Sequence, residues 1–160
     1  MPYRQEKFFS SGPFILIKDY CLTGIDCHFL GCGHNLDSPM LPYIASGPSS
    51  GAGVEIGVNC WLATSVTVLQ GVKIGHGSII GARSIVTHSI PPFSIAFGNP
   101  CKVVKRFDFK NNKWVDIKDW LDDWEQLMPN EENYLSYLIE RNNSLQPSLI
   151  ASSRRFGWLK

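Results

Sequence analysis

The sequence predicts a mainly β protein built as a coil of short strands, because side chains of one kind recur every six residues from Ile56 to Pro91. The first repeated column is aliphatic, and the second, four residues later, is small or apolar. The columns are Ile56, Leu62, Val68, Ile74, Ile80 and Val86, and Cys60, Val66, Val72, Ser78, Ser84 and Ile90. A period of six fits neither an amphipathic helix nor a long alternating strand, but it fits short strands joined by tight turns.

Side chains alternate within each short strand, so both columns face one interior and Trp61 faces outward. If three hexads complete one turn of the coil, residues 18 apart stack, with Trp61 over Ile79 and Thr67 over Ile85. An outward column that holds Trp and Ile predicts a contact surface.

Composition limits the functional classes. A chain of 160 residues with a net charge of +1 fits one main domain with small appendages, and it argues against nucleic acid as the partner. The N-terminus shows no long apolar run, so we expect no signal peptide, no membrane span and a cytoplasmic location. Five cysteines without a CxxC motif agree with a reducing compartment.

Cys and His are frequent between residues 27 and 34, where a zinc site is one interpretation. The six-residue phase favours another, because Cys21, Cys27 and Cys60 fall in the small inward column and would pack as core. We therefore expect no metal.

The elements follow in order. Residues 1–13 are a leading segment, and residues 14–101 form the coil domain, with degenerate hexads from Ile17 to His34. Residues 35–53 interrupt the period with a long Pro- and Gly-rich loop, which is typical of a functional loop that packs over a site. Pro91-Pro92 ends the regular turns, and the chain leaves the coil at residues 98–100.

Residues 102–160 form an appendage. A hairpin is expected around Asn111-Asn112 and a helix over residues 116–128, followed by a second helix that Asn130 caps. Three cations at Lys102, Lys105 and Arg106 suit a polyphosphate ligand. The tail from residue 143 predicts nothing.

The repeat, together with Trp61, the GlyAlaArgSer corner and GlyAsnPro at residues 98–100, resembles the hexapeptide-repeat acetyltransferases. The similarity is closest to sugar and polysaccharide O-acetyltransferases and covers roughly residues 17–106. The resemblance implies a left-handed parallel β-helix, acetyl-CoA as the acetyl donor, and a homotrimer with active sites between subunits.

Transfer of acetyl to a hydroxyl needs a base, and a histidine suits that role. His34 lies in the outward column directly before the loop, where the family places its catalytic histidine, and His28 is the second candidate. His76 and His88 fall at corners. His34 would remove the proton during direct transfer, and backbone N–H groups would hold the oxyanion.

The resemblance also implies residues for the cofactor and the acceptor. The cofactor residues are Trp61, Ala63, Thr64, Ala82, Thr87, Lys102 and Lys105. Asn35 and Asp37 lie close enough to His34 to bind an acceptor hydroxyl. The favoured acceptor is a sugar of a surface polysaccharide or its precursor.

Three other functions stay open. They are a xenobiotic acetyltransferase of the streptogramin or chloramphenicol type, a non-catalytic β-helix scaffold, and a metalloenzyme on the same coil. The last needs three converging histidines, whereas His76 and His88 fall on different corners.

Overall fold

The computed structural model describes residues 14–49 and 53–142, which form two compact units, one ending at Met128 and the other beginning at Pro129. The predicted leading segment 1–13 and the tail from residue 143 lie outside the described residues.

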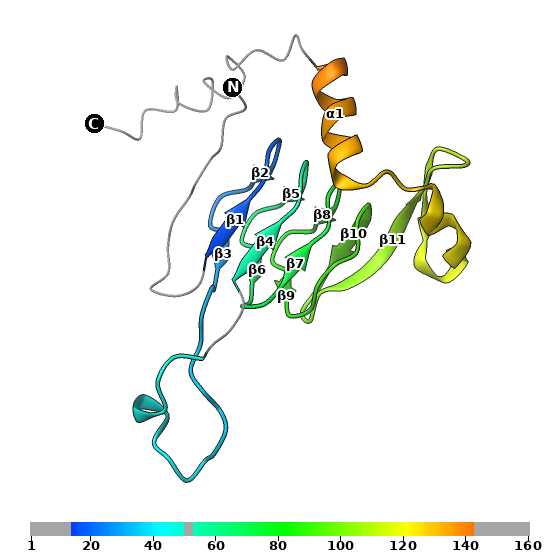
Figure 1. The fold of residues 1–160 in the computed structure, drawn as a ribbon. Coiled ribbons are helices and arrows are strands. Elements are labelled where there is room, and N and C mark those ends of the chain that lie inside the picture. Colours follow the sequence, from blue (N-terminus) through cyan, green and yellow to red (C-terminus); the bar gives the residue numbers. More distant parts are fainter. Residues whose placement is uncertain (1–13, 50–52, 143–160) are drawn as a thin grey trace. The chain divides into compact units, whose positions relative to one another are not determined.

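Three sheets make up most of the first unit, and the chain visits them in turn (Figure 1). Sheet A holds β1 (Ile15–Ile17), β4 (Val54–Ile56) and β7 (Lys73–Ile74). Sheet C holds β3 (His28–Phe29), β6 (Thr67–Val68) and β9 (Ile85–Val86). Sheet B holds β2 (Leu22–Thr23), β5 (Trp61–Leu62), β8 (Ile79–Ile80), β10 (Ser94–Phe97), β11 (Lys102–Asp108) and β12 (Lys113–Asp116).

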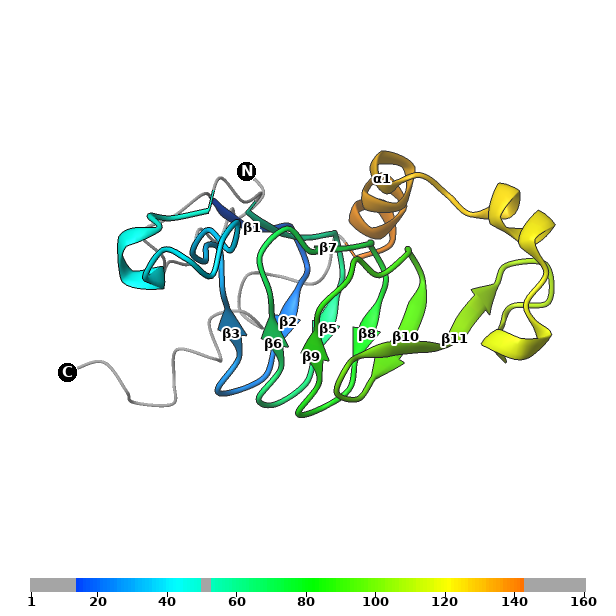
Figure 2. The same cartoon turned by 90° about the horizontal axis from the view of Figure 1, so that it is seen from below.

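One passage through sheets A, B and C is called a rung here, so that β1–β3, β4–β6 and β7–β9 are rungs 1, 2 and 3. Strands of successive rungs lie side by side and parallel, as Figure 2 shows for sheets B and C. Trp61 pairs with Ile79 and Thr67 with Ile85, which confirms the predicted 18-residue stacking.

Both inward columns form the core, and every member is at most 5% exposed. The buried hydroxyls are paired, because Ser78 donates to the Pro91 carbonyl and Ser84 to the Gly81 carbonyl. The Cys60 thiol is buried and donates to the Gly75 carbonyl at 3.2 Å.

Cys21 and Cys27 are half-buried and pack against the same core. The core interpretation of these cysteines and Cys60 is therefore confirmed. The described part of the chain shows no group of three His, Cys, Asp or Glu side chains that could hold a metal ion.

The corners between sheets are tight. At the corner between sheets B and C, a Cβ on Gly24 would lie 2.6 Å from the Thr64 backbone nitrogen, so only glycine allows the two rungs to approach there. Ser65 and Arg83 turn the same corner in the next two rungs with φ of 59° and 58°. We call residues 24–26, 63–65 and 81–83 the B/C corner.

The coil extends beyond its regular hexads. The sequence predicts that the turns end at Pro91-Pro92, but β10 adds one more parallel strand to sheet B, with Ile95 opposite Ile79. Phe93 makes this turn possible with φ of 51°, and its ring packs against His76 at 4.8 Å between centroids.

β11 then runs back along β10 and pairs with β12, both antiparallel. The connecting turn has Asn112 at φ of 52°, and the buried Asp108 carboxylate accepts hydrogen bonds from the backbone of Lys110 and Asn111.

The predicted helix over residues 116–128 is instead two 3₁₀ helices, η2 (Ile117–Asp119) and η3 (Asp122–Leu127). Trp120 between them is extended and stacks under the guanidinium of Arg106, 4.6 Å from the ring centroid. This tertiary contact interrupts the helical pattern.

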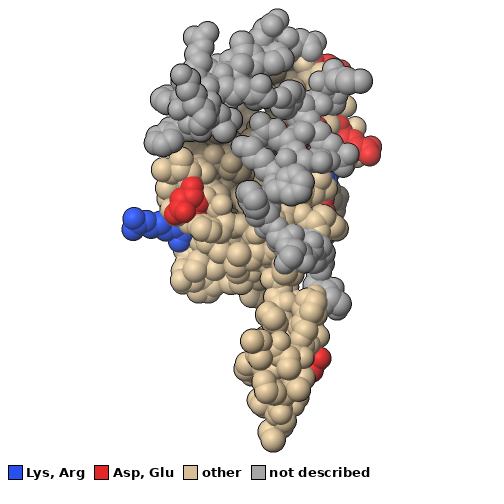
Figure 3. All heavy atoms as spheres, turned by 90° about the vertical axis from the view of Figure 1, so that its left-hand side faces the viewer, with Lys and Arg blue, Asp and Glu red and all other residues tan. Residues whose placement is uncertain are grey.

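The long loop leaves the coil after β3 and contains one short 3₁₀ helix, η1 (Tyr43–Ala45). It projects away from the three sheets (Figure 1). Its surface is almost uncharged (Figure 3), and Asp37 is its one charged residue among residues 35–49. Met40 and Ile44 are 90% and 91% exposed.

The second unit contains α1 (Glu131–Arg141). The Asn130 side chain accepts a hydrogen bond from the Asn133 backbone, so the predicted helix cap is present. No helix in residues 14–49 and 53–142 has the length and apolar character needed to cross a membrane.

Candidate active site

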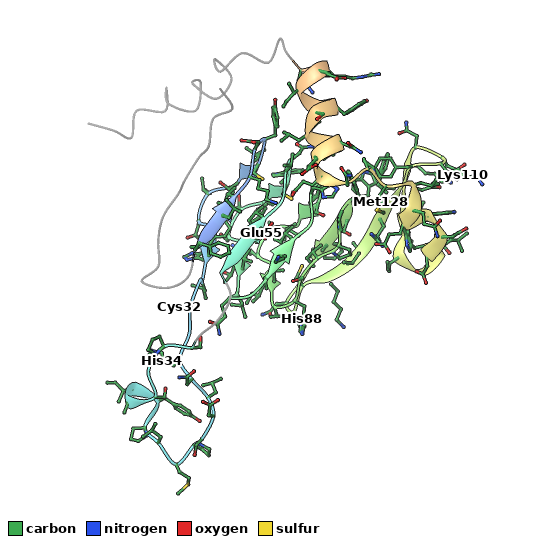
Figure 4. The ribbon with its side chains drawn as sticks, in the orientation of Figure 1. Cys32, His34, Glu55, His88, Lys110 and Met128 are labelled. Atoms are coloured by element: carbon green, nitrogen blue, oxygen red, sulfur yellow. The ribbon has the colours of Figure 1, made fainter. Side chains whose placement is uncertain are left out.

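His34 stands exposed at the base of the projecting loop, as Figure 4 shows. It forms an antiparallel bridge with Pro48 across the two ends of the loop. In the chain it lies between β3 of sheet C and β4 of sheet A, at the corner that joins these sheets. We call this the C/A corner, with residues 30–34, 69–72 and 87–89.

Contacts across the loop base fix the backbone beside His34. The Asn35 backbone N–H donates to the Gly47 carbonyl, and its side-chain amide donates to the Ser46 carbonyl at 3.0 Å. Asn35 is thus engaged in closing the loop through its amide nitrogen, whereas Asp37 is exposed.

Two polar residues at this base were missed by the sequence analysis. Ser49 Oγ accepts from the Gly33 N–H and donates to Gln70 Oε1 at 2.9 Å. Gln70 belongs to rung 2, so it ties the loop to the coil. The signal that could have found Gln70 is a long polar side chain at a corner, 36 residues after His34 in the chain but beside Gly33 in the coil.

Trp61 lies on the outer face of sheet B and is 48% exposed. Strand pairing places other side chains of sheet B in one outward row with Trp61. The row consists of Leu22, Trp61, Ile79, Ile95 and Lys105. Paired residues share a face of a sheet. The row is therefore an apolar strip that ends in a lysine.

Lys102 and Lys105 share this outer face because of a bulge. They are three residues apart, a spacing that places side chains on opposite faces of a regular strand. The register shifts between Ile95 and Ala96, so that Lys105 pairs with Ile95 and Lys102 with Phe97. At this bulge β11 has one residue more than β10, and the extra residue brings both lysines to the same face of the sheet.

Arg106 is not available to a ligand in the way the basic cluster suggests. It is 6% exposed, and its Nη2 donates to Glu125 Oε1 at 3.0 Å. Arg106 Nε and Trp120 Nε1 are buried without a hydrogen-bond partner among the described residues. Arg106 anchors the 3₁₀ segment, which leaves Lys102 and Lys105 as the accessible cations.

Ala63, Thr64 and Ala82 lie together at the B/C corner, in rungs 2 and 3. The Arg83 N–H donates to the Thr64 carbonyl, which stacks the two rungs directly. Lys102 closes the same column beyond rung 3, because it pairs with Phe97, which packs over Gly81.

Thr87 is separated from these residues. It lies at the C/A corner, and its Oγ1 is 2.9 Å from His88 Nδ1. Figure 4 places His88 at the edge of the coil near the end of β9. Of the proposed cofactor residues, Thr87 alone is on the corner that carries His34.

The second candidate base, His28, begins β3 and is exposed. Its Nε2 lies 2.9 Å from Asp26 Oδ1, and Ser65 Oγ donates to Asp26 Oδ2 at 2.9 Å. The hydrogen bond from Ser65, followed by the contact with His28, lowers the pKa of the Asp26 carboxyl below its ordinary value. Asp26 thus links the exposed imidazole of His28 to Ser65.

The predicted site residues fall into two groups on one chain. Trp61, Lys102 and Lys105 belong to sheet B, with Ala63, Thr64 and Ala82 at its border with sheet C. His34, Asn35 and Asp37 lie at or beyond the C/A corner, which does not border sheet B. A single coil therefore does not bring the two groups together.

The hexapeptide columns and the three-sheet coil define this protein as a hexapeptide-repeat protein. No protein-family model matches the chain. A Staphylococcus aureus (strain COL) protein named as an acetyltransferase is 58% identical over 55 residues, which are 34% of this chain and 28% of that protein. Chloramphenicol acetyltransferase of Klebsiella aerogenes is 31% identical over 107 residues, covering 58% of this chain and 51% of the relative.

Among solved structures, galactoside acetyltransferase in complex with coenzyme A matches with a TM-score of 0.50 and 30% identity, over 61% of this chain and 48% of that one. The chain is thus similar to acetyltransferases in sequence and in fold, as the repeat predicts. It spans about half, or less, of the length of these curated relatives.

Proposed function

We propose that this chain is an acetyl-CoA-dependent O-acetyltransferase that acts on a hydroxyl of a sugar, in a surface polysaccharide or its precursor. The observation that carries the proposal is the coil itself, which resembles galactoside acetyltransferase in complex with coenzyme A. In this proposal residues 14–101 form a left-handed β-helix acyltransferase domain, residues 102–160 form an appendage, and the enzyme works in the cytoplasm.

The B/C corner fits the acetyl donor. Ala63, Thr64 and Ala82 have small side chains, so an extended pantetheine arm can approach the backbone across two rungs. Lys102 and Lys105 supply the charges for its phosphates at the end of the column. The Trp61 side chain lies beside the same corner. Thr87 is at the other corner, so in this proposal it contacts the donor that is bound at the B/C corner of a neighbouring chain.

The separation of the two groups supports a site between chains. His34 with Asn35 and Asp37 from one copy would face the donor corner of the next, as in the homotrimer that we propose. Such a contact joins two different surfaces, the loop base of one copy and the donor corner of the next. Copies joined in this way form a closed ring rather than a two-fold dimer.

In the reaction, His34 takes the proton of the acceptor hydroxyl as the oxygen attacks the acetyl carbonyl. Asn35 Oδ1 and the Asp37 carboxylate would accept hydrogen bonds from sugar hydroxyls. Coenzyme A supplies the activated thioester.

The test measures free thiol released from acetyl-CoA with maltose, a galactoside and chloramphenicol as acceptors, and identifies the product by mass spectrometry. We expect transfer to a sugar hydroxyl. Transfer to chloramphenicol alone would favour the xenobiotic function, which the Klebsiella aerogenes relative supports. A chain that does not bind acetyl-CoA would be a scaffold, and the proposal would be wrong.

His34→Ala tests the base. Because general-base catalysis contributes about 10²- to 10⁴-fold, kcat should fall by that factor with little change in the KM for acetyl-CoA. Asp37→Asn removes the charge of a neighbouring loop side chain but keeps its size. It should instead mainly raise the KM for the acceptor. Unchanged turnover in His34→Ala would remove His34 from the mechanism.

A further inference from the structure

The Asp26–His28–Ser65 cluster joins rungs 1 and 2 on the line of the proposed donor. Asp26 is in the B/C corner, and Ser65 of rung 2 binds it directly. The Ser65 N–H also donates to the Ile25 carbonyl at 2.9 Å, so the corner is continuous from rung 1 to rung 2. His28 stands beside this corner on sheet C, opposite Thr67.

The order of residues along the corner sets the direction of the donor. Lys102 lies at one end, followed by Ala82, then by Ala63 and Thr64, and finally by Asp26. Four strand spacings of about 4.8 Å separate β11 from β2, roughly 19 Å in all. If the phosphates are bound at Lys102 and Lys105, the arm runs toward rung 1, and its sulfur end arrives at the cluster.

We propose that His28 is a second catalytic residue, which donates a proton to the sulfur of the leaving coenzyme A, and that Asp26 is its positioning residue. This inference rests on the proposed function. The oxygen–carbon bond forms and the carbon–sulfur bond breaks. His34 receives the proton of the hydroxyl, His28 gives its proton to the sulfur, and exchange with water restores both imidazoles.

The surroundings of His28 suit a proton donor. The hydrogen bonds to Asp26 lower the pKa of its carboxyl, and its Oδ1 lies 2.9 Å from His28 Nε2, where it can orient the imidazole. Its neighbours Ser65, in the B/C corner, and Thr67, on β6, do not titrate near neutral pH. Arg83 is the other charged residue of this corner, in rung 3. In this proposal Nδ1 is the ring nitrogen that gives the proton, because Nε2 is engaged with Asp26.

The first test needs no acceptor. Coenzyme A is added to the full chain while the imidazole resonances are followed by NMR, with His28 assigned from His28→Gln and binding measured separately by calorimetry. A change in the His28 resonance at saturation is expected. Binding without such a change overturns the role of His28 but leaves the proposed function intact, whereas absence of binding removes both.

The second test uses the acceptor on which the wild-type protein is active. His28→Gln should lower kcat about 10- to 100-fold and change the KM for acetyl-CoA less than threefold. Asp26→Asn should lower kcat and change the KM for acetyl-CoA less than threefold, because it weakens the contact that orients the imidazole, and Asp26→Glu, which keeps a carboxylate, should recover part of the lost kcat. Asp123→Asn, an exposed acid on η3, is the matched control.

A purely structural cluster would behave differently. Loss of Asp26 would then lower stability and leave kcat close to that of wild type. A kcat within twofold of wild type in His28→Gln or in Asp26→Asn contradicts the proposal.

Discussion

Glu55 lies on β4, on the outer face of sheet A, between two lysines. Lys18 follows β1 and Lys73 is on β7, the strands on either side of β4. Its carboxylate is 2.8 Å from Lys18 Nζ and 3.3 Å from Lys73 Nζ. The hydrogen bond from Lys18 is the main cause that lowers the pKa of Glu55, against a smaller opposing effect of burial. A lowered pKa means that the contact stabilises the fold above the ordinary pKa and is lost as pH falls through the folded-state value.

Glu55→Gln should therefore reduce the free energy of unfolding at pH 7, by up to about 1 kcal/mol because the lysines are partly exposed. The difference from wild type should shrink as pH falls below the ordinary glutamate pKa of about 4.3 and vanish below the lowered folded-state pKa. Urea unfolding at a series of pH values measures it. Asp119→Asn serves as the control, and an equal loss at pH 3 and pH 7 would show that packing, not charge, is responsible.

The position of His34 before the loop is visible in the sequence, but its surroundings are not. The bonds that fix the loop base join Asn35 to Ser46 and Ser49 to Gln70. These pairs are separated by 11 and 21 residues, and no local pattern couples them. A period identifies which face a residue occupies, whereas loop closure depends on contacts that only the folded chain defines.

The strands show where periodic patterns succeed and where they fail. Inward columns from Ile56 to Ile90 follow from the six-residue period, because each strand has one buried face. β11 breaks the alternation with a bulge, which is why Lys102 and Lys105 share a face. The pattern of residues 116–128 predicts a helix, but the stacking of Trp120 on Arg106 favours two 3₁₀ turns instead.

The lysines of β11 give a prediction at this scale. Lys102→Ala combined with Lys105→Ala should raise the KM for acetyl-CoA about tenfold or more, since each charged contact to a phosphate contributes about 1.5 kcal/mol. kcat should stay within about threefold. Steady-state kinetics at low and high salt measure this, because the variant should also lose the salt dependence of KM.

Lys110→Ala with Lys113→Ala is the matched control, because both lysines are exposed at the tip of the same hairpin. If this control raises the KM as much, the effect reflects net charge. An unchanged KM in the Lys102 and Lys105 variant would place the phosphates elsewhere.

At the scale of the molecule, the proposed site between chains predicts an oligomer. The loop that carries His34 at its base is almost uncharged, and Leu36, Met40 and Ile44 are each at least 76% exposed. A contact with another copy would cover them. Light scattering should therefore report a closed oligomer larger than a dimer, and a monomer that retains full activity would contradict the arrangement.

Mixing two inactive variants tests the central claim most directly. His34→Ala removes the proposed base, and Ala82→Trp, at an exposed position of the B/C corner, is designed to block the proposed donor site. The two variants are unfolded together, refolded as mixed oligomers, and assayed for transfer from acetyl-CoA, with Gln126→Trp as the control for the bulky substitution. Activity should return in the mixture, because some sites combine an intact His34 with an intact corner. If the mixture is no more active than either variant alone while wild type refolds to full activity, the site does not lie between chains.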